Sequence, residues 1–164
     1  MAHNLRTFAV KRAVLSASVA AIINIIIVYY ALKGKTDVPL FASVAEIWNH
    51  SLIGALIPRS LIISFIITIT TVFATAKEAS RKSENISIKI KNVSWIKTVI
   101  KKALIRALIA FILVLMLAFI LRILFPTYAT LSVSVVIPIV GIFAALVAFS
   151  MTLSAVYSTG KMLE

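Results

Sequence analysis

The sequence contains no cysteine and only two histidines, His3 and His50. The absence of cysteine excludes disulfides, thiolate catalysis and thiolate metal sites. The two histidines fall on opposite sides of the membrane in the topology argued below, so they are not expected to share a metal ion. The composition therefore predicts no metal centre and no resident cofactor.

Acidic residues are also scarce, with 5 of them against 17 lysines and arginines. None of the acidic residues lies within a predicted membrane crossing, whereas proton relays and cation-coupled transporters generally use buried carboxylates. The sequence also lacks a Gly-rich phosphate loop, a paired-carboxylate site and a nucleophile next to a base. These absences predict a protein that is not an enzyme.

The chain is instead rich in apolar residues and positive charge. Apolar residues make up 62% of the 164 residues, charged residues 13%, and the mean hydropathy is +1.09. A soluble domain is about half apolar and about a quarter charged, so this excess indicates an integral membrane protein. The net charge of +12 is then explained by membrane orientation and attraction to anionic lipid head groups. Nucleic acid is not an expected partner, because no recognition module is present.

Four long apolar runs predict an all-α membrane protein with four transmembrane helices and a single domain over residues 1–164. The predicted crossings are 13–32, 58–77, 103–124 and 131–156, and about twenty residues suffice to span about 30 Å. Ser43-Val44-Ala45-Glu46 matches a capping box, a pattern that marks the start of a helix. Residues 44–57 are therefore predicted to form an outer interfacial helix. The sequence leaves open whether this helix continues through Pro58, with a kink, or is separate from the second crossing.

The main basic segment, 78–102, connects the second and third crossings. Because short loops rich in lysine and arginine stay on the cytoplasmic side during insertion, this segment and both termini are predicted to be inside, at the inner (plasma) membrane. From Ser94 the pattern becomes helical, which predicts an interfacial basic helix before the third crossing. The lysines predicted to contact lipid head groups are Lys89, Lys91, Lys97, Lys101 and Lys102.

Several residues within the crossings are candidates for helix packing or for a transport pathway. Asn24 lies in the middle of the first crossing, where a polar amide needs a partner, and a hydrogen bond between helices is favoured over a substrate contact. Arg59 follows Pro58 at the predicted kink and is expected to extend its side chain to the outer surface. Pro138 and Gly141 are expected to bend or loosen the fourth crossing.

Small residues recur at every fourth position on two of the predicted helices. Ala17 and Ala21 belong to such a stripe on the first helix, and Gly141 and Ala145 form one on the fourth. Such faces allow helix backbones to approach closely. A contact between these two helices within one chain and a seam between two copies of the chain would both use them, and the sequence leaves both open.

The segment from Gly34 to Phe41, followed by a Ser-capped helix from Ser43 to Pro58, resembles a group of small bacterial four-helix membrane proteins of unknown function. In that group an asparagine in the first helix and a Val-Pro-Leu-aromatic outer turn recur at similar places, where this chain has Asn24 and Val38–Phe41. The basic linker is longer here than in that group. The resemblance implies the four-helix topology and implies no activity.

These patterns predict one function and leave one alternative. The leading hypothesis is a non-enzymatic membrane subunit or scaffold that acts through helix–helix contacts and a basic cytoplasmic surface. The alternative is a small oligomeric transporter or channel whose pathway would include Asn24, Pro138 and Gly141. The expected partners are membrane lipids with anionic head groups, and either further copies of the chain or a larger membrane complex.

Overall fold

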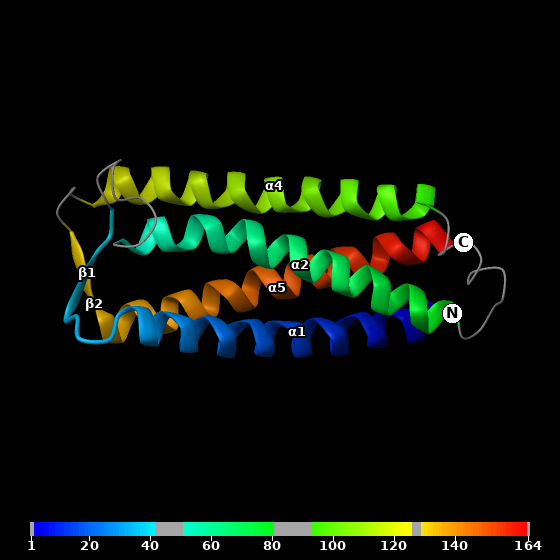
Figure 1. Ribbon diagram of the computed structural model, residues 1–164, viewed down its shortest axis with the longest axis horizontal. Coiled ribbons are helices and arrows are strands. Elements are labelled where there is room, and N and C mark those ends of the chain that lie inside the picture. Colours follow the sequence, from blue (N-terminus) through cyan, green and yellow to red (C-terminus); the bar gives the residue numbers. More distant parts are fainter. Residues whose placement is uncertain (1, 42–50, 81–92, 126–128, 164) are drawn as a thin grey trace.

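The computed structural model describes residues 2–41, 51–80, 93–125 and 129–163. These residues form four long helices and two short strands (Figure 1). The helices are α1 (Ala2–Ala31), α2 (Leu52–Ser80), α4 (Val93–Leu124) and α5 (Val133–Leu163), and the strands are β1 (Asp37–Pro39) and β2 (Thr130–Ser132). The predicted all-α class is confirmed, with the addition of one short strand pair.

Each of the four helices contains a segment long and apolar enough to cross a membrane. The segments are Thr7–Ala31, Leu52–Ser80, Ser94–Leu124 and Val133–Gly160. A backbone in lipid has no water to bond, so a spanning segment becomes a helix in which the backbone groups bond one another. The predicted number of long apolar helices is confirmed.

Large apolar side chains cover the outside of the bundle. Phe119 is 68% exposed, Ile123 is 70% exposed and Leu146 is 63% exposed. In water, a continuous surface of this kind would drive association with other proteins. In a bilayer it contacts lipid tails, which are as apolar as the side chains themselves. The exterior is therefore that of a multi-pass membrane protein.

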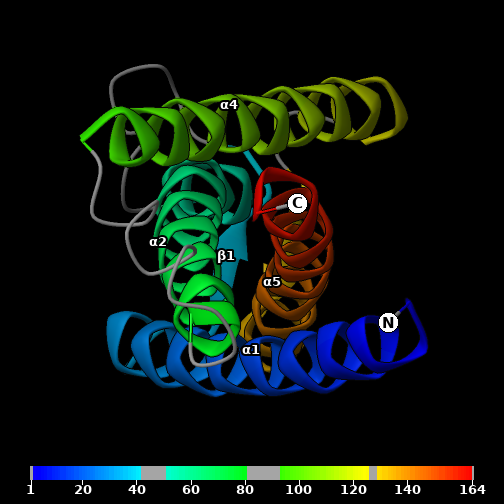
Figure 2. The same cartoon turned by 90° about the vertical axis from the view of Figure 1, so that its right-hand side faces the viewer.

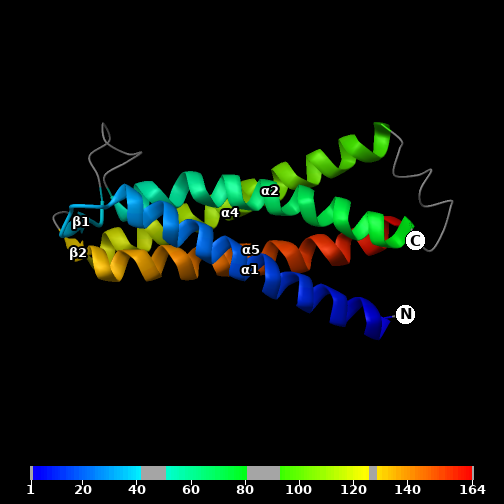
Figure 3. The ribbon, with the colours of Figure 1, turned by 60° about the horizontal axis from the view of Figure 1, so that its bottom comes forward.

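The helices form three layers when the bundle is viewed from one end (Figure 2). α2 and α5 lie side by side in the middle layer, with α4 across one side of the pair and α1 across the other. The principal helix contacts are α1 with α5, α5 with α2, and α2 with α4. The N-terminal half of α1 diverges from the middle layer (Figure 3), so α1 is held mainly by α5.

Both described ends of the chain lie at one end of the bundle, together with the last turn of α2 and the first turn of α4 (Figure 1). Lys77, Lys97 and Lys101 belong to these helix ends and are exposed. The segment from Ser94 that is predicted to form a basic interfacial helix belongs to α4, which runs without interruption from Val93 to Leu124. The same end of the bundle therefore carries the termini and this basic surface.

The strand pair closes the opposite end. β1 and β2 are antiparallel with Val38 opposite Leu131, and the N–H of Leu40 donates a 2.8 Å hydrogen bond to the carbonyl of Ala129. Gly34 turns the chain from α1 towards β1 with a φ of 86°, a conformation that glycine adopts without a steric cost. The pair covers a core formed by Val28, Leu32, Val38, Leu40, Leu52, Leu56, Val114, Val136 and Val140.

The described part of α2 begins at Leu52, within the segment predicted as an outer helix, 44–57. Ser51 caps the helix, because its Oγ accepts a 3.0 Å hydrogen bond from the N–H of Gly54. The predicted cap at Ser43 lies outside the described residues, and the last part of the predicted outer helix, 52–57, forms the first turns of α2. The helix continues through Pro58 to Ser80.

Candidate functional site

Small side chains close the contact between α1 and α5. Gly141 is buried there, and a Cβ atom at this position would lie 2.6 Å from Cγ1 of Ile25 and 3.9 Å from the carbonyl oxygen of Ala21. Only glycine permits this approach without a movement of Ile25. One turn further along α5, Ala144 and then Ala148 have 0% exposure and cluster with Ala20 of α1.

Within the middle layer, one face of α2 is also packed closely through small side chains. Every fourth residue on one face of α2 has 0% exposure, and these residues are Ser60, Ser64, Thr68, Val72 and Ala76. The Ser60 hydroxyl donates a 2.7 Å hydrogen bond to the carbonyl of Ile57. The hydroxyl oxygens of Ser64 and Thr68 are buried without a hydrogen-bond partner among the described residues. Close packing here is achieved at the cost of unsatisfied polar atoms.

Arg106 connects α4 to α5. Its Nε donates to Ser154 Oγ at 3.1 Å, and its Nη2 donates to the Ser154 carbonyl at 3.0 Å and to Ser158 Oγ at 2.6 Å. Only 9% of the residue is exposed, so it does not extend to the membrane surface. Its Nη1 is buried without a partner among the described residues. The guanidinium is therefore bound mainly within the protein, as a charge in an apolar bundle requires.

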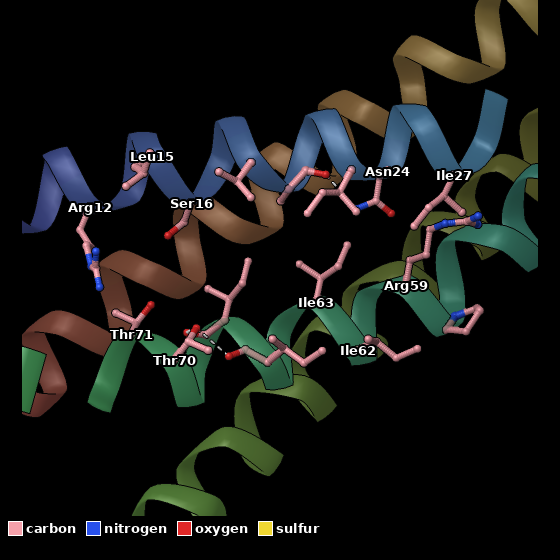
Figure 4. A pocket seen from close by; sticks show the side chains of 16 residues that line it. Arg12, Leu15, Ser16, Asn24, Ile27, Arg59, Ile62, Ile63, Thr70 and Thr71 are labelled. Atoms are coloured by element: carbon pink, nitrogen blue, oxygen red, sulfur yellow. Dashed lines mark hydrogen bonds between the residues drawn. The ribbon is translucent and has the colours of Figure 1, made fainter. Parts of the chain in front are cut away.

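α1 and α2 do not pack closely as α1 and α5 do, because a groove with a volume of 790 Å³ lies between them (Figure 4). This volume lies within the range of about 300–1,000 Å³ that is usual for small-molecule sites. All of the lining residues come from these two helices. They are Arg12, Leu15, Ser16, Val19, Ala20, Ile23, Asn24 and Ile27 from α1, and Pro58, Arg59, Ile62, Ile63, Ile66, Ile67, Thr70 and Thr71 from α2.

The groove is apolar in the middle and basic towards both ends. Arg12 reaches from α1 towards α2 at one end, close to Thr71, and Arg59 reaches from α2 towards Ile27 at the other (Figure 4). None of the described lining residues is acidic. The groove therefore presents a long apolar surface between two positive charges.

Arg59 is held by the preceding turn of its own helix. Arg59 Nη1 donates a 2.7 Å hydrogen bond to the carbonyl of Ala55, in that turn. The side chain thus remains half-buried against its own helix, where part of it lines the groove.

The predicted site residues fall into four groups. Asn24, Pro58 and Arg59 line the groove. The Asn24 amide donates a 2.8 Å hydrogen bond to the carbonyl of Ala20 in its own helix, which replaces the expected hydrogen bond between helices. Gly141 and Ala21 meet between α1 and α5. The remaining described residues are half-buried in the case of Ala17, Ala145 and Lys102, and exposed in the case of Pro138, Lys97 and Lys101. Lys89 and Lys91 lie outside the described residues.

Sequence reasoning missed Arg12 as a groove residue and Arg106 as a link between helices. Groove residues recur on α1 with spacings of three and four, which is the signature of one helix face. Because the other faces of α1 are also apolar, hydropathy does not reveal this face. Ser16 and Asn24 are the polar residues that mark it in the sequence.

Neither a metal centre nor a relative suggests an activity for the groove. In the part of the chain that the structure describes, no three His, Cys, Asp or Glu residues lie close enough together to hold a metal ion. Comparisons with protein-family models, curated proteins and solved structures found no match. The chemical character of the groove is therefore defined by the side chains that line it.

Proposed function

We propose that the chain is a non-enzymatic binding subunit of the inner (plasma) membrane, in which the groove between α1 and α2 holds a membrane-embedded partner. The observation that supports this is the contrast between the groove and the other contacts of the bundle. Small buried residues such as Gly141 and Ala144 close α5 against α1. Branched side chains such as Ile62 and Ile66 line the groove and stay exposed.

The lining supports binding rather than catalysis. It consists of aliphatic residues, two arginines, one amide and a few hydroxyl groups, without a carboxylate or imidazole among the described residues. No hydroxyl there can be paired with a general base, as nucleophilic catalysis requires. An apolar site with a few polar groups is instead typical of ligand recognition.

The basic end of the bundle supports a cytoplasmic orientation in this proposal. Lys97 and Lys101 are exposed near the start of α4, where they can contact anionic head groups. Cleavage by a protease at Lys89 or Lys91 is expected only when the protease has access to the inner side of the membrane. Cleavage in intact cells treated from outside would reverse the proposed orientation.

The binding proposal is tested by site-specific photocrosslinking in native membranes. A photoreactive amino acid replaces Ile66 in the groove or, as a control, Ile112, which is exposed on α4. A discrete adduct is expected at position 66 and only general lipid labelling at position 112. Equal labelling at the two positions would contradict a dedicated partner.

One observation favours the alternative of a transporter or channel. Ser64, Thr68, Thr152 and Arg106 each have a buried polar atom without a hydrogen-bond partner among the described residues, and polar groups at membrane depth often mark a pathway. The purified chain, reconstituted alone into vesicles, distinguishes the two functions. Saturable solute flux would establish transport and remove the proposal of a binding subunit, whereas its absence is expected.

A further inference from the structure

The two arginines of the groove lie at equivalent depths near opposite membrane surfaces. Arg12 is seven residues from Val19, the midpoint of Thr7–Ala31, and Arg59 is seven residues from Ile66, the midpoint of Leu52–Ser80. Each is therefore about 10 Å from the middle of its apolar segment, compared with a hydrocarbon half-thickness of about 15 Å. An arginine side chain can extend from this depth to the phosphates of the nearer leaflet.

The two ends of the groove differ in how free the arginine is to bind. Nη1 of Arg59 is already bonded to the Ala55 carbonyl at 2.7 Å. Asn24, the polar residue of α1 at this end of the groove (Figure 4), already donates its amide to the Ala20 carbonyl. At the other end, Arg12 has the hydroxyl groups of Ser16 and Thr71 nearby (Figure 4). Arg12 therefore combines a positive charge with potential hydrogen-bond donors, a combination suited to a phosphate.

We propose that the groove binds an acidic phospholipid of the predicted cytoplasmic leaflet. Its phosphate contacts Arg12, with Ser16 and Thr71 beside it, and an acyl chain lies along Ile23 and Ile66. This inference rests on the proposed function, since it names the partner that the groove holds.

Charge decides between a lipid and a transmembrane helix as the occupant. A helix that filled the groove would cover both arginines, and it could neutralise them only with acidic side chains at membrane depth, which are costly there. A phospholipid carries its negative charge at the head-group level, within reach of Arg12, and brings an apolar chain to the apolar middle. The cytoplasmic leaflet is also the one in which acidic lipids produce a negative surface potential.

The test uses the full chain in phosphatidylcholine vesicles that contain phosphatidylglycerol with a photoreactive acyl chain. After illumination, labelled peptides are identified by mass spectrometry, and the labelling of α1 and α2 groove peptides is divided by that of the lipid-facing side of α4. Arg12→Gln is expected to lower this ratio about fivefold, as loss of one basic contact near the surface predicts. Arg12→Lys is expected to retain part of the labelling, because it keeps the charge.

Lys11→Gln is the matched control for charge. Lys11 adjoins Arg12, is exposed and does not line the groove, so its replacement changes the net charge equally and is expected to leave the ratio unchanged. Ile66→Trp tests the acyl-chain part of the site, since it fills the groove and should reduce the labelling. Ile112→Trp adds the same bulk on the exposed surface of α4 and should not reduce it.

Two results would overturn the lipid inference. One is equal groove labelling by photoreactive phosphatidylcholine, and the other is an equal loss of labelling in Arg12→Gln and Lys11→Gln, which would indicate general charge attraction. If the groove is not labelled by phosphatidylglycerol while the adduct at position 66 in native membranes is a protein, the lipid inference fails and the binding function stands. If neither experiment labels the groove above the control, both fail.

Discussion

The two faces of α1 meet the bundle in opposite ways. Towards α5 the helix lies against Gly141, with Ala20 clustered beside Ala144 and Ala148. Towards α2 it faces a groove of 790 Å³. The same helix therefore has one face packed against protein and one face that borders an open groove.

The two faces of α1 differ in the size of the residues they contact and not in the polarity of those residues. Lipid tails and protein side chains are about equally apolar, so burial of an apolar residue adds little to association within a membrane, and close packing becomes decisive. Alanine and glycine permit that packing, whereas the isoleucines of the groove hold the backbones of α1 and α2 apart. Substitutions that add bulk should consequently have opposite consequences on the two faces.

Gly141→Leu is expected to have the largest effect, because it breaks the closed face. A Cβ atom alone would lie 2.6 Å from Ile25 Cγ1, and overpacking of a core commonly costs about 1–3 kcal/mol. The free energy of unfolding, measured by SDS titration in mixed micelles, should fall by an amount in this range. Ile25→Ala should partly restore it by removing the clashing atoms.

Ser150→Leu is the control for Gly141→Leu, since Ser150 is exposed on the same helix and the change should be nearly neutral. Equal destabilisation by the two substitutions would show that the close approach of α1 and α5 has no special importance.

Arg106→Leu should have the next largest effect. It removes the three hydrogen bonds from Arg106 to Ser154 and Ser158, and hydrogen bonds between membrane helices are worth up to about 2 kcal/mol. Lys101→Leu, at an exposed position on the same helix, should change the unfolding free energy very little. A double-mutant cycle with Ser158→Ala should give a coupling energy of at least about 0.5 kcal/mol, and additive effects would contradict the link between α4 and α5.

Thr68→Val examines the unsatisfied hydroxyl groups of the closed middle layer. The Thr68 hydroxyl is buried without a partner among the described residues, so an isosteric methyl group should leave stability unchanged or raise it by about 1 kcal/mol. Thr75→Val is the matched variant, because Thr75 Oγ1 donates to the Thr71 carbonyl at 2.8 Å, and it should be slightly destabilising. A greater loss in Thr68→Val than in Thr75→Val would reveal a partner for Thr68, such as a water molecule in a pathway.

Ile66→Trp should have the smallest effect on stability, although it introduces the largest side chain. Ile66 is 53% exposed and lines the groove, so the larger ring has space, and the change in unfolding free energy should stay within about 0.5 kcal/mol. Its effect should appear in occupancy of the groove instead. Destabilisation comparable to that of Gly141→Leu would mean that α1 and α2 close on each other in the membrane.

Several features of the fold follow from sequence in a simple way. Apolar runs of membrane length predict four long helices, and the structure has them. The third crossing is predicted to end at residue 124, and α4 ends at Leu124. The cap of α2 within the described residues is Ser51, whereas the capping box predicted at Ser43 lies outside them and stays a prediction.

The candidate site was only partly predictable. Asn24, Pro58 and Arg59 were recognised as unusual within apolar helices, and all three line the groove. Their grouping was not predicted, because it depends on how α1 is placed relative to α2. Arg12 directly precedes the predicted first crossing, 13–32, and its position at the groove is visible only in the folded chain.

Length, hydropathy and charge distribution were enough to establish the membrane class and the number of long helices, because these depend on what a backbone requires in lipid. They could not establish which helices pack together or where a groove remains. Every helix carries apolar residues around most of its circumference, so hydropathy alone does not distinguish a face against protein from a face against lipid. The distinction depends on the folded chain, in which Gly141 allows α1 to approach α5 closely and the isoleucines of α2 keep α1 away from α2.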